Sequence, residues 1–327
     1  MIEAMNLSGM KYGSKNLSIL DFAHLKAEGE SLTVTSGNGE IFTQRTFAGE
    51  AGHFETCVPF QALAEWTSAT GGPFKFDLEE KLVIRCKRNR TSLKTDNPEN
   101  YPWLPQGEPS FKANLVDAVS KVAWAVGKST WPVLSVVYLD NGKAVATDGF
   151  RLAVADYEFE GEEHHLLVPP EALKLLPDEM VRVALANQKI IFSGSTERVI
   201  AVPLNETYPK YQRLLPQKFV AEVRIDAKKL LRSIKTALLF YENIRLVITQ
   251  KNDINIWSVG AETGDCQITQ EAQVEGVALE IYINGKYLVD GLSAIEGEVV
   301  LKSEGINSKL QMESPGWKYV VMPLMEK

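Results

Sequence analysis

The sequence is poor in the residues from which metal centres and disulfide frameworks are built. Its 327 residues include three cysteines and four histidines, and no cysteine pair has CxxC spacing. The one adjacent pair, His164 and His165, is expected on a strand, where neighbouring side chains point to opposite faces and do not easily share an ion. We therefore predict no metal ligands. Scattered cysteines without an apolar leader favour a reducing compartment, and we expect a cytoplasmic protein.

Membrane segments and enzyme signatures are also missing. No run of about 18 apolar residues occurs, so no membrane-spanning helix is predicted. None of the patterns GxSxG, HExxH, GxxxxGK[ST] and GxGxxG is present, which leaves no indication of a cofactor. The most site-like stretch, ATDGFRLAVAD at 146–156, places Asp148 and Arg151 beside a glycine without a partner nucleophile or base. We predict no catalytic residues and keep an enzyme that uses this pair as an alternative.

Acidic residues outnumber basic ones, and the two signs are segregated along the chain. The net charge is −7, which argues against a protein that coats nucleic acid nonspecifically. Residues 224–239 nevertheless carry five basic residues and one acidic residue, whereas residues 156–163 carry five acidic residues and no basic one. We therefore expect a local basic surface within an acidic protein.

The chain also repeats itself. NPENYPWLP at 97–105 resembles NETYPKYQRLLP at 205–216, and both segments end in Leu-Pro. CVPFQALAEW at 57–66 resembles LVPPEALKLL at 167–176, and YINGKYLVDGL at 282–292 is a weaker third copy. Three similar units would fill the chain, with boundaries just after the Leu-Pro pairs, because proline stiffens a linker. We predict three domains: 1–105, 106–216 and 217–327.

Each unit is predicted to place helices on short antiparallel strands, an α+β fold. Apolar spacing predicts a first helix within 112–127 in the second unit and within 225–242 in the third, whereas none can be drawn for 1–16. DNG at 140–142 and KND at 251–253 predict hairpins. A second helix is expected after Val-Pro in the first two units, and a last hairpin closes each unit.

Basic residues share a face of the expected third-unit helix. Lys228, Arg232 and Lys235 have the spacing i, i+4, i+7, and the second-unit helix repeats this more weakly with Lys112 and Lys121. Such a face suits sequence-independent contact with phosphates. A merely solvated face is the alternative for any one helix. No zinc-finger spacing or RNA-recognition motif indicates base readout.

Three short motifs resemble those of a known family, the bacterial DNA sliding clamps, which are the beta subunits of DNA polymerase III. VATDGFRLA at 145–153 resembles a hairpin of the middle domain, YPKYQRLLP at 208–216 the linker between the second and third domains, and YVVMPL at 319–324 the C-terminal strand. LSIL at 17–20 is similar to an early strand of the family. The order of all segments matches, and the resemblance covers 17–327.

The resemblance implies three tandem clamp-type domains that form half of a pseudo-six-fold ring. Two subunits would join head to tail as a homodimer, encircle double-stranded DNA without sequence preference, and serve DNA replication as a processivity factor. The DNA-binding residues would be Lys112, Lys121, Lys228, Arg232 and Lys235. At the dimer interface, Leu93 on the edge 89–95 would face the partner, together with Phe240 and Tyr241.

The resemblance also implies a groove between domains 2 and 3 that binds short linear peptides of the replicative polymerase and of clamp-loader subunits. By motif position, the residues that line this groove would be Val133, Thr147, Gly149, Phe150, Arg151, Leu152, Pro209, Arg213, Leu214, Asn284, Tyr287, Val320, Val321, Met322, Pro323 and Leu324. An apolar floor with a few oriented polar edges is typical of such grooves.

Three departures from the family pattern bear on these expectations. Phe150 stands where the family usually has histidine. The start of the sequence is short where the family has a strand and the first pore-lining helix, and the end continues as Met-Glu-Lys after Leu324. A clamp-like scaffold that binds the same peptides without encircling DNA is therefore the alternative function.

Overall fold

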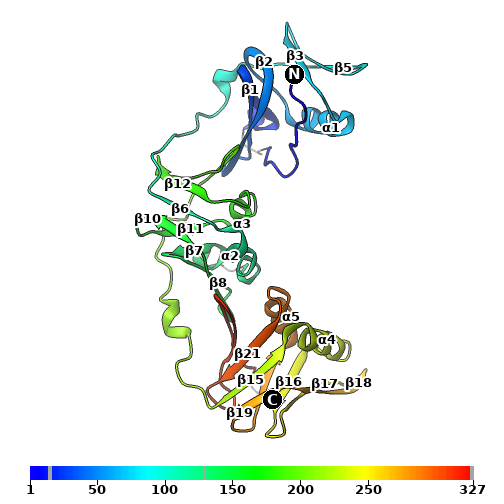
Figure 1. The fold of residues 1–327 in the computed structure, drawn as a ribbon, viewed down its shortest axis with the longest axis vertical. Helices are drawn as coiled ribbons and strands as arrows, with labels where there is room; N and C mark the ends of the chain where they lie inside the picture. Colours follow the sequence, from blue (N-terminus) through cyan, green and yellow to red (C-terminus); the bar gives the residue numbers. More distant parts are fainter. Residues whose placement is uncertain (14–16, 129, 325–327) are drawn as a thin grey trace. The chain divides into compact units, whose positions relative to one another are not determined.

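The computed structural model describes residues 1–13, 17–128 and 130–324, and Figure 1 shows antiparallel sheets with short helices packed on them. The chain forms two compact units. Unit 1 consists of Met1–Val116, Phe159–Glu163 and Glu171–Pro203, and unit 2 consists of Asp117–Glu158, His164–Pro170 and Leu204–Lys327. The α+β class predicted from the sequence is observed. The three-domain division at 105 and 216 stays a prediction.

Unit 1 is built around a seven-stranded antiparallel sheet of order β1-β2-β14-β13-β12-β6-β10. Its strands are β1 (Phe22–Gly37), β2 (Ile41–Pro59), β14 (Glu197–Ala201), β13 (Lys189–Ser193), β12 (Val181–Ala186), β6 (Phe111–Ala113) and β10 (Phe159–Gly161). A smaller sheet joins β3 (Lys75–Leu78), β4 (Leu82–Cys86) and β5 (Asn89–Leu93), and helix α1 (Phe60–Thr70) packs on β1, β2 and β5.

The first residues of unit 1 belong to its core although they form no helix. Ile2 pairs with Phe74 through two backbone hydrogen bonds of 3.0 and 2.8 Å. Met5, Leu7 and Met10 are buried in the same cluster as the apolar residues of β1, β4 and α1. A segment without a helix therefore contributes its apolar side chains to the core of unit 1.

Unit 2 contains a nine-stranded antiparallel sheet of order β11-β7-β8-β9-β23-β22-β21-β15-β19. Its strands are β11 (His165–Val168), β7 (Val137–Asp140), β8 (Lys143–Thr147), β9 (Arg151–Asp156), β23 (Trp317–Val321), β22 (Leu310–Ser314), β21 (Glu298–Ser303), β15 (Ala221–Asp226) and β19 (Gln273–Gly276). The pairing of β9 with β23 brings together segments that are far apart in the sequence.

A four-stranded sheet completes unit 2. It has the order β18-β17-β16-β20, with strands β18 (Gly264–Glu271), β17 (Asp253–Gly260), β16 (Asn243–Ile248) and β20 (Leu279–Asn284). Helices α4 (Ala227–Ala237) and α5 (Gly285–Ser293) pack against each other and on these strands, as Figure 1 shows. None of the helices in the described part of the chain has the length and hydropathy needed to cross a membrane.

Most of the predicted local elements are present. DNG forms the β7–β8 turn with positive φ at Asn141 and Gly142, which suits the right-handed twist of a hairpin, and KND forms the β16–β17 turn. Helices begin directly after Val58-Pro59 and Val168-Pro169, although α3 (Pro170–Leu173) is only four residues long. The predicted closing hairpins are β4–β5, β13–β14 and β22–β23.

The predicted helix over 112–127 is wrong. Residues 111–113 are strand β6, helix α2 covers only Val116–Ser120, and a 3-10 turn follows at Ala123–Ala125. The reason is tertiary: Lys112 pairs with Arg182 of β12 and with Glu160 of β10, so sheet formation overrides the helical spacing. In the third unit the helix is observed, but it ends at Ala237 rather than extending to 242.

If residues 1–13 are part of the core of unit 1, removing their buried side chains must destabilise the protein. Leu7→Ala and Met10→Ala should each lower the free energy of unfolding by about 2–5 kcal/mol, the usual loss for a buried aliphatic side chain. Leu17→Ala, at a half-exposed position, is the matched control and should have little effect. Urea unfolding curves measure the difference, and equal curves for all three variants would contradict this packing.

Candidate functional site

The stretch Thr147–Leu152 forms a turn that the side chain of Asp148 stabilises. The Oδ1 atom of Asp148 accepts hydrogen bonds from the backbone N–H groups of Phe150 and Arg151, at 2.9 and 3.0 Å. Gly149 has a φ of +93°, a conformation that favours glycine. The turn therefore projects Phe150 outward, and its side chain is 63% exposed.

The last strand of the chain lies directly beside this turn. Val321 is paired with Arg151 and Val320 with Leu152, and the N–H of Met322 donates to the carbonyl oxygen of Phe150 at 2.9 Å. The structure thus places YVVMPL next to TDGFRL. Because alternate residues of a strand point to opposite faces, the predicted groove residues separate into two groups.

The first group forms an apolar face. Leu152, Val320 and Val133 are buried in one cluster, and the linker residues Tyr208 and Tyr211 cover the same cluster. Thr147 is paired with Leu152, and its hydroxyl donates to the carbonyl oxygen of Arg151 at 2.6 Å, so this hydroxyl is already satisfied within the turn.

Large apolar side chains remain exposed beside this floor. Leu214 of the linker turn η5 (Tyr211–Leu214) and Met322 are each 43% exposed, and Met322 is bonded through its backbone to Phe150. The exposed Pro209 and Arg213 belong to the same linker, and Lys309 holds the linker by donating to the carbonyl oxygen of Leu214 at 3.1 Å. Exposed apolar groups gathered in one place indicate a surface that binds other molecules.

The second group surrounds the guanidinium of Arg151, which is turned away from the apolar face. Its Nε donates to Asp148 at 2.9 Å, its Nη1 bonds Asp290 of α5, and its Nη2 donates to the carbonyl oxygen of Trp124 at 3.3 Å. The guanidinium carbon lies 4.5 Å from the centre of the Tyr287 ring. Burial alone would lower the pKa of Arg151, but hydrogen bonds to Asp290 and Tyr319 and the charge of Asp148 raise it.

The remaining groove candidates anchor the end of the chain. Asn284 caps α5 by accepting the N–H of Lys286 at 3.0 Å, and the N–H of Leu324 donates to the carbonyl oxygen of Tyr282 at 2.8 Å. Val321 is fully buried, and Pro323 is half-buried. Asp290, Trp124 and Tyr319 complete the Arg151 cluster. The sequence holds no signal for them, because only the fold brings them together. The final Met-Glu-Lys lies outside the described residues.

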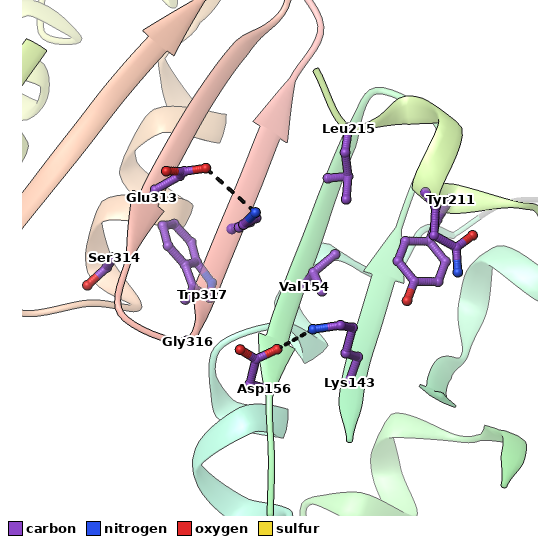
Figure 2. A pocket seen from close by; sticks show the side chains of 11 residues that line it. Lys143, Val154, Asp156, Tyr211, Leu215, Glu313, Ser314, Gly316 and Trp317 are labelled. Carbon is purple, nitrogen blue, oxygen red and sulfur yellow. Dashed lines mark hydrogen bonds and ion pairs between the residues drawn. The ribbon is translucent and has the colours of Figure 1, made fainter. Parts of the chain in front are cut away.

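A hollow of about 200 Å³ lies further along β9, and Figure 2 shows its lining. Val154, Tyr211 and Leu215 line it, and the ion pairs Lys143–Asp156, at 2.6 Å, and Lys318–Glu313, at 3.8 Å, lie beside them. None of the predicted groove residues lines this hollow. Its residues come from several segments of mixed charge, which is why sequence reasoning missed it.

The predicted DNA-binding residues do not all lie on helices. Lys228, Arg232 and Lys235 are exposed on α4, opposite the buried Leu230 and Ile234, and Lys229 extends the same basic face. Lys228 is also 3.1 Å from Glu296. Lys112 lies on a strand and Lys121 follows α2, with acidic partners at 3.7 and 2.6 Å, so the prediction that these two share a helix is wrong.

Leu93 lies on the edge strand β5, whereas Phe240 and Tyr241 lie in the connection between α4 and β16. The side chain of Leu93 points into the core of unit 1, which corrects the expectation that it faces outward. Its strand β5 is nevertheless an edge strand, and β18 is an edge strand of unit 2. Tyr241 is exposed and Phe240 partly buried, and Thr263, next to β18, donates to the carbonyl oxygen of Phe240.

The two adjacent histidines are held by separate partners. His164 is buried against the hydroxyl of Tyr157, and His165 is 2.9 Å from Asp140. Within the ranges that the structure describes, no cluster of histidine, cysteine and acidic residues could bind a metal ion. Asp148 and Arg151 are paired with each other and fixed by the turn, which is a structural role.

Comparisons with known proteins agree with this geometry. Residues 212–325 match the sequence model of the DNA polymerase III beta subunit, C-terminal domain. The beta sliding clamp of Streptomyces coelicolor is 27% identical over 92% of this chain and 90% of that protein, and the beta sliding clamp of Pseudomonas putida is 26% identical over 97% and 95%. The sliding clamp of Bacillus subtilis has a TM-score of 0.85 at 21% identity over 96% of this chain and 94% of that one, and the DNA polymerase III beta subunit of Thermotoga maritima has a TM-score of 0.84 at 21% identity over 100% and 99%.

The structural matches define the fold as that of a DNA polymerase sliding clamp. The match to the C-terminal domain and the nearly full-length relatives then support a bacterial beta sliding clamp, to which this chain is similar along nearly its whole length. Sliding clamps are replication processivity factors and not enzymes, so this similarity supports the prediction that the chain is not an enzyme.

The Arg151 cluster yields a stability test. Arg151→Lys keeps the charge but loses the planar fork that bridges Asp148 and Asp290, so the free energy of unfolding should fall by about 1–3 kcal/mol. Arg213→Lys, an arginine at an exposed position of the same unit, should change it by less than about 0.5 kcal/mol. Equal stabilities of the two variants in urea unfolding would show that the fork contributes nothing.

Proposed function

We propose that the chain is a DNA sliding clamp: two copies close head to tail around duplex DNA, and each tethers polymerase and other proteins through a peptide-binding groove in unit 2. The activity belongs to the cytoplasm, where bacterial DNA is replicated. The observation that supports the proposal is the set of exposed apolar side chains of Phe150, Leu214 and Met322 beside the buried cluster that contains Leu152 and Val320.

The groove has the chemistry of a peptide site. Its floor is aliphatic, and its rim holds the flexible side chain of Met322, which adapts to different partners. The replicative polymerase and clamp-loader subunits are the expected partners, through short segments with a glutamine and two or three large apolar residues. Phe150 has no hydrogen-bonding nitrogen, unlike the histidine that is usual in the family. We therefore expect this position to prefer apolar residues of the partner peptide.

Two edge strands support head-to-tail assembly by their opposite charge. The edge segment 87–94, which contains β5, carries four basic residues and no acidic one. The segment 262–271, which contains β18, carries three acidic residues and no basic one. Exposed edges of opposite sign suit antiparallel pairing between two copies and disfavour pairing of like edges.

Contact with DNA would come chiefly from α4, because its exposed face carries Lys228, Lys229, Arg232 and Lys235. Phosphate contacts from these ammonium and guanidinium groups need no base recognition and weaken with salt. Lys112 and Lys121 are engaged by acidic neighbours and would contribute less. DNA should therefore be held loosely, as sliding requires.

One observation favours the second candidate, a peptide-binding scaffold that does not encircle DNA. Helix α1, FQALAEWTSAT, has no basic residue, and residues 1–13 form no helix. Basic residues would then line only part of the surface that faces DNA. The oligomeric state separates the two candidates, because only a closed ring can retain DNA topologically.

The groove makes a binding prediction. Leu214→Glu should weaken binding of a glutamine-containing apolar peptide by at least about tenfold, because a charge on the apolar wall must be desolvated when the peptide docks. Leu185→Glu replaces another exposed leucine, on β12 of unit 1, and should leave the affinity unchanged. Isothermal titration calorimetry measures both, and equal affinities would place the peptide elsewhere.

The charged edges make an assembly prediction. Light scattering should give twice the chain mass of 36.3 kDa, and Arg88→Glu with Arg90→Glu should shift the protein toward monomer. Adding Glu262→Lys and Asp265→Lys should restore the dimer, because the edges are again opposite in sign. A monomeric unmodified protein would exclude the ring and favour the scaffold, and failure of the rescue would refute the edge pairing.

A further inference from the structure

Unit 1 contains a hollow that the proposed function does not use. It has a volume of about 520 Å³ and lies between the long strands β1 and β2 and the linker segment 98–106. The strand side of this linker hollow is formed by His24, Lys26, Thr35, Gln44 and Glu55. The linker side includes Tyr101 and Trp103.

The same backbone frame occurs in both units. Asn38 in unit 1 and Asp148 in unit 2 each accept two backbone N–H groups through Oδ1, from Glu40 and Ile41 in one case and from Phe150 and Arg151 in the other. In each unit, the residue that follows a neighbouring strand bonds back to this turn. The N–H of Val202 donates to the carbonyl oxygen of Glu40 at 3.2 Å, and the N–H of Met322 donates to the carbonyl oxygen of Phe150 at 2.9 Å.

The linkers follow the same plan. Tyr101 and Tyr208 each precede a proline, are 8% exposed, and have hydroxyls without a partner among the described residues. Tyr101 is stacked on His24 with ring centres 5.6 Å apart, and Tyr208 on Tyr138 at 4.7 Å. The strand registers make four lining residues of the linker hollow equivalent to four of unit 2: His24, Lys26, Thr35 and Gln44 correspond to Tyr138, Asp140, Val145 and Val154.

In unit 2, the equivalent space is occupied by Tyr211. Its hydroxyl donates to Asp140 at 2.8 Å, its ring meets Tyr138 edge-on with centres 6.3 Å apart, and it packs in the cluster with Val145 and Val154. The unit 1 linker lacks this residue. Five residues separate the proline from Leu-Pro in unit 2, and only Trp103 does so in unit 1. The linker hollow is therefore the space that the missing turn leaves.

Two hydrogen-bond donors, Lys26 and Tyr101, line the linker hollow beside the carboxylates of Glu55 and Glu99. Lys26 stands where Asp140 accepts the tyrosine hydroxyl, so a donor replaces an acceptor. Its hydrogen bond to Glu28 raises the pKa of Lys26, which keeps it cationic. The buried hydroxyl of Tyr101 is a second donor, because burial raises the pKa of Tyr101 and keeps it protonated.

We propose that the linker hollow is a second docking site, which takes an aromatic side chain, flanked by acidic residues, from a partner protein. The ring occupies the place of the missing tyrosine, and the acidic neighbours accept from Lys26 and Tyr101. Trp103, 71% exposed at the mouth of the hollow, packs against the adjoining segment of the partner. Large exposed aromatic residues of this kind are common at the centres of protein interfaces.

The probe that tests this proposal is the capped tripeptide Asp-Tyr-Asp, with capped Asn-Tyr-Asn and Asp-Leu-Asp as controls. With ¹⁵N-indole labelling, titration should shift the signal of Trp103 saturably and leave the other five tryptophans unchanged. Affinity should be about millimolar, since a short flexible peptide loses conformational freedom on binding. Both control peptides should bind more weakly. No shift of Trp103, or equal shifts with all three peptides, would overturn the proposal.

Two substitutions test the donors. Tyr101→Phe should weaken binding roughly three- to tenfold without lowering the melting temperature, because the hydroxyl has no partner to lose. Tyr208→Phe is the matched control in unit 2 and should leave the titration unchanged. Lys26→Glu should reverse the preference for acidic over amide neighbours. Unchanged affinity in both Tyr101→Phe and Lys26→Glu would show that the probe binds elsewhere.

A graft tests the geometry. Insertion of Lys-Tyr-Gln-Arg, the sequence of residues 210–213, between Pro102 and Trp103, combined with Lys26→Asp, should fill the linker hollow and abolish probe binding. Persistent binding would overturn the site. Phenylacetate is the remaining probe: if it bound as tightly as Asp-Tyr-Asp, the hollow would be a site for small aromatic acids, and the partner-protein proposal would fail. Peptide binding at the unit 2 groove is measured separately and does not depend on these results.

Discussion

Antiparallel pairing of β9 with β23 is the interaction on which unit 2 depends. It joins residues 151–155 to 317–321 and sits in the middle of a nine-stranded sheet, so both halves of that sheet are held by it. The pairing fixes Phe150 and Met322 as neighbours on one edge and aligns Leu152 with Val320 on the apolar face. The position of the apolar face is therefore a consequence of sheet closure.

Arg151 supports this closure from the opposite face. Its guanidinium reaches the turn through Asp148 and helix α5 through Asp290, while the rings of Trp124 and Tyr287 lie against it. A residue that looks functional in the sequence thus serves to hold two secondary-structure elements at a fixed separation. Arg151 and Leu152 have different roles because neighbouring residues of a strand point to opposite faces of the sheet.

The sequence predicts the local elements best where turn chemistry determines them. Asn141-Gly142 and Asp148-Gly149 require positive φ at defined positions, and both turns are found. Strand β6 is missed because its partners, β10 and β12, come from distant segments, and pairing overrides the helical spacing that includes Val119 and Val122. Leu93 is placed on the wrong face because an isolated edge strand does not reveal which side is covered. The linker hollow is invisible in the sequence because it arises from residues that one linker lacks.

The order in which the chain is synthesised gives the β9–β23 pairing a kinetic meaning. The partner of Arg151 is Val321, 170 residues later and close to the C-terminus. The β9 edge therefore remains unpaired while those 170 residues emerge from the ribosome, and such an edge can pair with the wrong strand. Unit 2 can complete its sheet only after β23 has been synthesised, so products truncated before β23 should expose this edge and depend on chaperones.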